Sequence, residues 1–201
     1  MLSVRRTIAL ALCLAFTLAL MGTCCASRST TAPAAMERDA TSATPLSEPG
    51  LPNLHRVTPN LYRGAQPTAE GFRRLKEMGI RTVVNLRSEH SDRAEFKGSD
   101  LDLVEIPTRA WGVADDKVVA FLKVALDPAR QPVFVHCQHG ADRTGLMVAA
   151  WRVAACGWTK DEAIREMTEG GFGYHSIWKD LIEDFRKADV ERLKRSAILD
   201  D

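Results

Sequence analysis

A cysteine and an arginine six positions apart are the residues of this sequence with the clearest chemical potential. Cys137 and Arg143 fall in one short stretch, which reads His136-Cys137-Gln138-His139-Gly140-Ala141-Asp142-Arg143-Thr144-Gly145. A cysteine thiolate is a strong nucleophile, and the planar guanidinium of arginine binds two oxygens of one anion at once, which lysine cannot do. The spacing therefore predicts a nucleophile and an anion-binding cation within a single loop.

The segments on either side of this loop predict how it is held. Residues 133–135 form a short, continuous apolar run, which is typical of a central strand covered on both faces. An apolar helix is expected from about Thr144 to Cys156, with Gly157 ending it. A loop between such a strand and helix lies at the carboxyl end of a sheet, where ligands bind in open α/β folds. The helix N-terminus adds unpaired N–H groups and partial positive charge, so the loop should bind an anion and favour the thiolate form of Cys137.

The residues inside this loop suit the transfer of a phosphoryl group, whose transition state spreads negative charge over the equatorial oxygens. Catalysis then depends on positioning and on stabilising that charge. We expect the phosphate to be bound by Gln138, His139, Gly140, Ala141, Asp142, Arg143 and Thr144. The Thr144 hydroxyl should also stabilise the sulfur of Cys137 as a leaving group when water hydrolyses the phosphocysteine. His136 should orient the loop through hydrogen bonds.

The order of these residues resembles the signature of the protein tyrosine and dual-specificity phosphatase superfamily, in which a strand, Cys-x5-Arg, two glycines and a helix follow one another. Two further stretches, 61–67 and 82–87, are similar to small atypical dual-specificity phosphatases of bacteria, fungi and plants. The resemblance covers roughly Leu54 to Arg186. It implies a cysteine-dependent phosphatase that hydrolyses phosphate monoesters through a cysteinyl-phosphate intermediate, without a metal ion or another cofactor.

The general acid is the part of the pattern that departs from this superfamily, whose members usually carry an aspartate that protonates the leaving oxygen. Here no carboxylate stands at 108–112, just after Ile106-Pro107. We predict Asp115 as the catalytic acid and keep two alternatives, Asp116 and Asp142. Asp115 and Asp116 would otherwise cap a helix and complement its dipole. Asp142 has a counterpart in myotubularin-like phosphatases, and its other role would be to accept hydrogen bonds that stabilise the loop.

The rest of the chain alternates between strand and helix patterns. Apolar and β-branched runs predict strands at 61–63, 80–86, 101–106 and 133–135. Capping residues followed by apolar positions at helical spacing predict helices at 68–78, 115–126, 144–156, 159–169 and 177–192. This alternation implies an α/β sandwich around a central, largely parallel sheet flanked by helices. The glycine-rich stretch from Gly170 to His175 is expected as a turn that either borders the site or only reverses the chain.

The N-terminus has the pattern of an export signal. Arg5 and Arg6 precede an uncharged, mostly apolar run at 7–21, and small residues follow it. The run is shorter than the ~20 residues that span a bilayer comfortably. Cys24 and Cys25 leave two outcomes equally open, which are plain secretion and attachment of an N-terminal lipid as in a bacterial lipoprotein. The mature protein is therefore expected to be exported, either periplasmic or anchored to a membrane.

Length and composition indicate one folded unit behind this signal. The chain has 201 residues, 45% hydrophobic and 26% charged, with a net charge of +1, which fits a single soluble domain and gives no global sign of nucleic-acid binding. The expected segments are the signal (1–26), a flexible linker rich in Ser, Thr, Ala and Pro (27–53), the phosphatase domain (54–192) and a tail (193–201). Beyond Cys25 the only cysteines are Cys137 and Cys156, so no disulfide framework is expected.

Two other functions stay open at this level. A rhodanese-like sulfurtransferase or an arsenate reductase also places a cysteine in an anion-binding loop, although neither usually has this histidine before the cysteine. A non-catalytic phosphate-binding module would not need Cys137. The carboxylate of Asp142 inside the loop should disfavour a polyanion, so the expected substrate is a phosphorylated protein or a small phosphoester. The sequence leaves the oligomeric state open.

Overall fold

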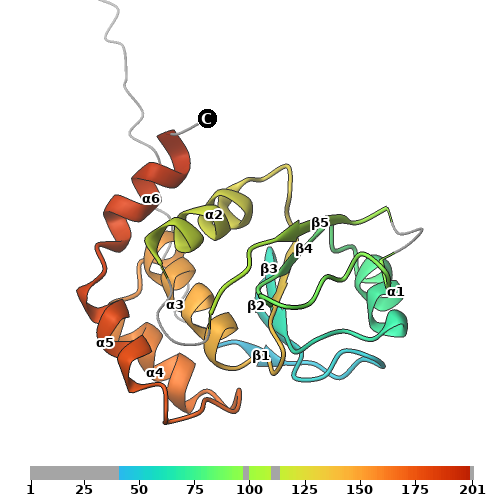
Figure 1. Cartoon of the computed structure of the whole chain (residues 1–201), viewed down its shortest axis with the longest axis horizontal. Helices are drawn as coiled ribbons and strands as arrows, with labels where there is room; N and C mark the ends of the chain where they lie inside the picture. The colour runs from blue at the N-terminus through green and yellow to red at the C-terminus, as the bar shows by residue number, and fades with distance from the viewer. Residues whose placement is uncertain (1–40, 97–99, 110–113, 200–201) are drawn as a thin grey trace, which may run out of the picture. The chain divides into compact units, whose positions relative to one another are not determined.

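The computed structural model describes residues 41–96, 100–109 and 114–199 of the chain. Its described strands form a six-stranded sheet in the order β1-β2-β3-β6-β4-β5 (Figure 1). The strands are β1 (Thr44–Pro45), β2 (His55–Thr58), β3 (Leu61–Gly64), β4 (Thr82–Asn85), β5 (Asp102–Glu105) and β6 (Val133–His136). Strands β3, β6, β4 and β5 pair in parallel, while β1 and β2 add antiparallel strands beyond β3. The expected largely parallel sheet is confirmed.

Helices cover both faces of this sheet. The described helices are α1 (Ala69–Glu77), α2 (Asp115–Leu126), α3 (Asp142–Cys156), α4 (Lys160–Glu169), α5 (Lys179–Lys187) and α6 (Val190–Leu199). Figure 1 shows α1 on one side of the sheet and α2 and α3 on the other, with α4, α5 and α6 beyond them. Phe72 of α1 belongs to the same buried cluster as Phe134 of β6, and Phe121 of α2 to the same cluster as Val133. Successive residues of β6 therefore face opposite layers.

The position of β6 explains why its sequence is apolar throughout. It lies between β3 and β4, and all four of its residues are buried. A strand covered on both faces needs apolar residues at successive positions, not at alternate ones. The parallel register sets His136 beside Gly64 of β3 and beside Asn85 of β4. The chain therefore leaves the sheet at its carboxyl edge directly before Cys137.

Local signals set the ends of the helices that follow. Thr159 caps α4 in a capping box, in which its hydroxyl accepts from the Glu162 amide while the Glu162 carboxylate accepts from the Thr159 amide. Helix α3 is buried on nearly all sides, so its sequence is apolar all round and lacks an amphipathic stripe. Gly157 ends α3 in the left-handed region, with a φ of 67°.

The predicted end of the linker, at residue 53, was wrong, because residues 43–53 belong to the folded unit. Strand β1 pairs with β2, the Leu46 amide donates to the Leu54 carbonyl, and Leu51 is buried. These contacts are made mostly by the main chain, so they leave no hydrophobic period in the sequence. The composition of the segment resembles a spacer even though its backbone is paired.

The expected C-terminal boundaries were also wrong. The single helix predicted at 177–192 is two helices, α5 and α6, separated at Ala188 and Asp189. Residues 193–199, expected as a tail, form most of α6, where Leu193 and Ala197 are buried. The sequence pattern continued through the break because the two residues between the helices, Ala188 and Asp189, include no Gly or Pro that would signal a helix end.

The export signal predicted at 1–26, with its cysteines, lies outside the described residues, as does most of the linker. Of the helices formed by residues that the structure describes, none combines the length and the apolar character needed to cross a bilayer.

Candidate active site

Cys137 and Arg143 occupy one loop between β6 and α3, as the sequence predicted. We call residues 137–143 the cysteine loop. Cys137 follows the last residue of β6 and is 3% exposed, while Arg143 lies in the first turn of α3. The helix N-terminus directs its unpaired N–H groups and the positive end of its dipole toward this loop.

The carbonyl groups of the cysteine loop are held by residues outside it. Four successive carbonyls each accept a hydrogen bond: Gln138 O from Gln66 N (3.3 Å), His139 O from Asn53 Nδ2 (2.9 Å), Gly140 O from Arg63 Nη2 (2.8 Å) and Ala141 O from Gly145 N (2.7 Å). The C=O and N–H of a planar trans peptide point in opposite directions. Turning these carbonyls toward the protein therefore turns the loop amides the other way.

The amides of the cysteine loop are left for a ligand. Within the described residues, none of the backbone N–H groups of 138–143 donates a hydrogen bond to another part of the chain. Successive N–H groups that converge at a helix N-terminus make an anion-binding concavity. The arrangement therefore suits an oxyanion that is held by backbone amides and faces the sulfur of Cys137.

Gly140 allows the loop to lie directly against the sheet. Its φ of +70° is in the left-handed region, and a Cβ at this position would lie 2.4 Å from both the carbonyl carbon and the oxygen of Gly64. Gly64 is the last residue of β3. The close approach of two backbones requires a residue without a side chain at position 140.

Arg63 is a functional residue that the sequence analysis missed. This β3 residue is 1% exposed, its Nη2 donates to the carbonyls of Gly140 (2.8 Å) and Ala141 (3.4 Å), and its guanidinium lies 3.7 Å from the centre of the Phe172 ring. Burial lowers the pKa of Arg63 to about 10, although the negative charges of Glu166 and of the Cys137 thiolate oppose the shift. Arg63 is therefore still a cation at neutral pH. An arginine in an otherwise buried strand was the signal that could have found it.

A buried histidine and aspartate fix the start of the loop. His136 and Asp92 are both fully buried, and His136 Nε2 lies 2.8 Å from Asp92 Oδ2. Gln66 Nε2 donates to Asp92 Oδ1 (2.7 Å), and Arg87 Nη1 donates to Gln66 Oε1 (2.8 Å). Burial alone would raise the pKa of Asp92, but the hydrogen bonds from His136 and Gln66 and the nearby histidine charges lower it overall. These contacts fit the expected orienting role of His136, whereas Asp92 was not anticipated.

Thr144 and Arg143 are placed so that each can serve a bound phosphate. The Thr144 hydroxyl is fully buried and has no hydrogen-bond partner within the described residues, so it is available to the sulfur or to a ligand. Arg143 Nη1 donates to the Thr108 carbonyl (3.2 Å), which ties the guanidinium to the segment after β5. Residues 110–113 of that segment lie outside the described part of the chain.

The three candidate acids are in different environments. Asp115 is exposed in the first turn of α2 and forms an ion pair with Arg192 of α6. Asp116 is also exposed and lies 3.4 Å from Lys117 Nζ. Neither caps the helix, because the N-cap is Ala114 and no side chain bonds to the first amides, so the expected capping role was wrong. Their charges still complement the helix dipole.

Asp142 connects the cysteine loop to the glycine-rich turn at 170–175. Its Oδ1 accepts from the His175 amide (2.9 Å) and its Oδ2 lies 2.8 Å from His175 Nδ1. Asn53 makes a second connection, because its Nδ2 donates to the carbonyls of both His139 and Phe172. The turn therefore borders the site, which decides between the two roles that the sequence left open.

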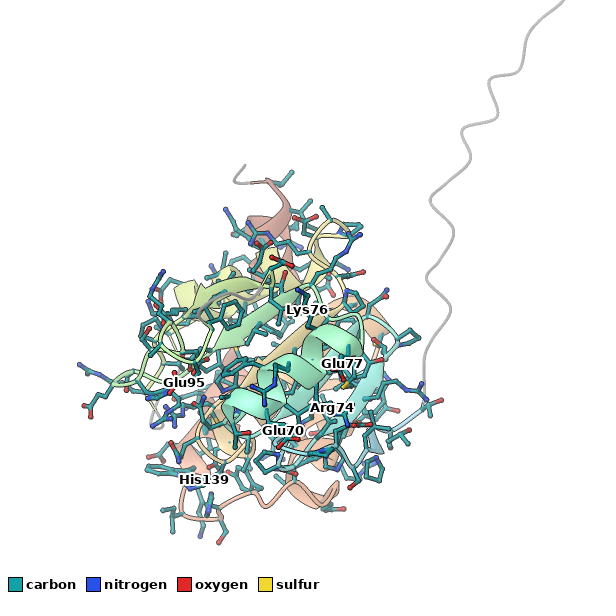
Figure 2. The ribbon with its side chains drawn as sticks, turned by 90° about the vertical axis from the view of Figure 1, so that its right-hand side faces the viewer. Glu70, Arg74, Lys76, Glu77, Glu95 and His139 are labelled. Atoms are coloured by element: carbon teal, nitrogen blue, oxygen red, sulfur yellow. The ribbon has the colours of Figure 1, made fainter. Side chains whose placement is uncertain are left out.

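Figure 2 shows His139 at the surface, on the side toward which α1 directs its N-terminal turn, marked by Glu70.

Comparison with known families gives one match to a family model. The model is described as "DSP-PTPase phosphatase fused to NAD+ Kinase", and it matches residues 50–181, which is more than half of the chain. The matched range contains the cysteine loop, Arg63 and Asp92, and it begins before the boundary that the sequence analysis expected at Leu54.

Individual relatives give further similarities. The chain is 38% identical to the dual specificity protein phosphatase TpbA of Pseudomonas aeruginosa over 143 residues, which make up 71% of this chain and 65% of TpbA. It thus spans slightly less than two thirds of that relative. A crystal structure of P. aeruginosa TpbA in complex with pTyr matches with a TM-score of 0.69 and 34% identity, covering 81% of this chain and 99% of that chain. The inositol diphosphatase DSP5 of Arabidopsis thaliana is 26% identical over 156 residues, which cover 72% of this chain and 73% of that protein.

Proposed function

The chain belongs to the family of DSP-PTPase phosphatases, and on that premise we propose that it hydrolyses phosphate monoesters through a cysteinyl-phosphate on Cys137. One observation carries this proposal. The loop that contains Cys137 and Arg143 has its carbonyls held from outside and its amides unengaged within the described residues. A sulfurtransferase or a binding module does not account for this combination of nucleophile, arginine and family.

The reaction follows from what each group in the loop can do. A phosphate monoester lies with its non-bridging oxygens on the amides of 138–143 and on the guanidinium of Arg143, which stabilise the charge of the transition state. The sulfur of Cys137 attacks phosphorus and the ester oxygen departs. Water then cleaves the phosphorus–sulfur bond, and the buried Thr144 hydroxyl stabilises the departing thiolate. Inorganic phosphate leaves the loop.

Phosphotyrosine is the substrate class that the observations favour. The homologous structure of TpbA holds pTyr. Asp142 lies within the cysteine loop, at the first residue of α3, and a fixed negative charge there disfavours a ligand with several phosphates. Against this stands the similarity to a plant inositol diphosphatase, so the two substrate classes must be compared directly.

A substrate panel on the full chain tests the function. It contains a phosphotyrosine peptide, a phosphothreonine peptide, an inositol polyphosphate, and thiosulfate with cyanide, and Cys137→Ser is the control. We expect release of phosphate from the phosphotyrosine peptide, less from the inositol polyphosphate, and none with Cys137→Ser. Faster turnover of the inositol polyphosphate would overturn the substrate class. Thiocyanate formation without phosphate release would overturn the phosphatase itself.

Export is a separate part of the proposal and depends on the N-terminal pattern alone. The basic residues, apolar run and small residues at 1–26 support a signal, and Cys24 and Cys25 support a lipid tether as one of two outcomes. Expression of the full chain in a bacterium, followed by fractionation, should place it outside the cytoplasm. Cys24→Ser combined with Cys25→Ser should release it from the membrane fraction if a lipid is attached. Recovery of both forms as soluble exported protein would indicate plain secretion.

A further inference from the structure

His175 lies beside the cysteine loop in an arrangement that serves proton transfer. Its Nδ1 is 2.8 Å from Asp142 Oδ2, its backbone amide donates to Asp142 Oδ1, and its side chain is 48% exposed. An ionised carboxylate only accepts hydrogen bonds, so Nδ1 carries the proton of this contact. Within the described residues nothing bonds to Nε2, which leaves that nitrogen free to exchange a proton.

The imidazole of His175 lies next to the loop that carries Cys137. Asp142 directly precedes Arg143, and the ring of His139, two residues after Cys137, lies edge-on to the ring of His175 with the centres 5.5 Å apart. The imidazole therefore contacts the cysteine loop at two separate points. The carboxylate of Asp142 and the ring of His139 are the titratable groups that face it from the described residues.

We propose that His175, oriented by Asp142, is the general acid and base of the reaction on Cys137. This inference rests on the phosphatase function proposed above and adds the residue that handles the proton. Asp142 positions the ring, as a carboxylate positions a catalytic histidine in other enzymes.

The proton and electron balance of the two steps is complete. As Cys137 Sγ bonds to phosphorus, the bond from phosphorus to the ester oxygen breaks, and its electron pair stays on that oxygen. The oxygen takes the proton of His175 Nε2, and the imidazolium becomes neutral. Water then attacks phosphorus, the phosphorus–sulfur bond returns its electron pair to Sγ, and the water proton goes to Nε2. The histidine ends in its starting form.

The other candidate acids are less well placed for this role. Both oxygens of Asp142 are already engaged by His175, one by its backbone amide and one by its ring, so neither is free to contact a leaving group. Asp115 is held in an ion pair with Arg192, and Asp116 is exposed beside Lys117. None of the three carboxylates that the sequence offered is therefore as well placed as the His175 imidazole to supply the proton.

The test compares two esters that differ in how much help their leaving group needs. The full chain and its variants are assayed with phenyl phosphate, whose leaving oxygen needs a proton, and with dinitrophenyl phosphate, whose leaving oxygen does not. His175→Asn is the informative variant, because its amide can still donate to Asp142 while it lacks an ionisable nitrogen. Asp115→Asn tests the rival acid, and Ile177→Ala, two residues after His175 and 76% exposed, is the matched control.

We expect His175→Asn to lose ~10²–10⁴-fold in kcat on phenyl phosphate and to change little on dinitrophenyl phosphate, with an unfolding temperature like that of the wild type. Ile177→Ala should keep both rates. Equal losses of His175→Asn on the two esters, or no loss on either, would sink the proposal, as would a selective loss in Asp115→Asn. If the wild-type chain hydrolysed neither ester, the phosphatase function itself would fail, and that outcome is distinct from a wild type that is active on both.

Discussion

The guanidinium of Arg63 is buried against the cysteine loop, which also contains Arg143, so two cations lie at one site. Arg63 bonds the carbonyls of Gly140 and Ala141, while Arg143 lies in the turn where the phosphate would lie. The hydrogen bonds of Arg63 fix the direction of the loop peptides, and the proposed function assigns Arg143 to the phosphate. The hydrogen bonds of one guanidinium thus decide which way the amides of the cysteine loop point.

Gly140→Ala tests the close approach of the cysteine loop to β3. The new Cβ would lie 2.4 Å from the backbone of Gly64, and alanine would also have to adopt a φ of +70°, which is unfavourable for a residue with a side chain. Gly79→Ala is the matched control, because it has a φ of +80° and nothing within 4 Å of the new Cβ. We expect each to lose ~1–2 kcal/mol of unfolding free energy from the left-handed conformation, and Gly140→Ala to lose more because its Cβ also clashes with the backbone of Gly64. Gly140→Ala alone should lose activity by more than about ten-fold, since misplaced donors cost catalysis steeply.

Measurement of kcat/KM and of the denaturation midpoint for both glycine variants separates the two effects. Similar activity in Gly140→Ala and Gly79→Ala would mean that the loop can move away from Gly64 without harm.

At the scale of strands and helices, polar contacts position the ends of these elements. The apolar pattern of the sequence does not specify those positions. The segment between β4 and β5 supplies Asp92, which holds His136 at the end of β6. Helices α3 and α4 are joined by a buried bidentate pair, in which Arg152 Nε and Nη2 donate to the two oxygens of Glu166 at 2.9 and 2.8 Å. The Ala43 amide donates to the same carboxylate, so this pair also holds the start of the folded unit.

Asp92→Asn should change the acid end of the stability profile. The pKa of Asp92 is lowered in the folded state, so its contribution is present above the unfolded value of about 3.9 and is lost as the pH falls through the folded value. The wild type should therefore be more stable than Asp92→Asn from pH 5 upward, and the two should converge as the pH falls below 4. Urea denaturation between pH 2.5 and 6 measures this difference. A difference that grew toward low pH would contradict the sign.

The Arg152–Glu166 pair predicts a non-additive pattern of mutations. Arg152→Met leaves the Glu166 carboxylate buried without its cation, which should cost ~3–5 kcal/mol. Arg152→Met combined with Glu166→Gln should cost less than the single arginine change, because no unpaired charge is left. Denaturant unfolding of the two single variants and the double variant gives the coupling energy. A strictly additive double variant would show that the pair contributes nothing as a pair.

In the whole folded unit, the N-terminal residues 41–53 complete the structure around the site. They supply β1, the buried Leu51 and Asn53, whose side chain joins the carbonyls of His139 and Phe172. The Thr41 carbonyl accepts from Arg152 Nη2 (3.1 Å). A segment that looks like a spacer by composition therefore connects the sheet, the cysteine loop and the helix layer.

Truncation tests this assignment at the scale of the whole molecule. A chain that begins at residue 41 should keep the stability and kcat/KM of the chain that lacks residues 1–26. A chain that begins at residue 54 should unfold at lower temperature and should lose activity, because it lacks β1, Leu51 and the Asn53 hydrogen bonds. Thermal unfolding and phosphate release on the two chains measure the effect. Equal behaviour of both would restore the boundary at 54 that composition suggested.

The sequence by itself determined that Cys137 and Arg143 share one loop between a buried strand and a helix, and that the sheet is largely parallel. These depend on residues adjacent in the chain: an apolar strand, a loop of fixed length and a helix, whose geometry follows from local spacing. The ends of the folded unit were misjudged for the opposite reason, because main-chain pairing at β1 and the break between α5 and α6 leave no periodic signal.

Only the tertiary structure decided which residues support the loop and which could handle the proton. Arg63 meets Gly140 across 77 positions, Asn53 meets His139 across 86, Asp92 meets His136 across 44 and His175 meets Asp142 across 33. Contacts over such separations depend on how strands and turns are brought together at the carboxyl edge of the sheet. A linear pattern records the residue types but not this convergence, because hydrogen bonding between distant polar groups imposes no period on the sequence.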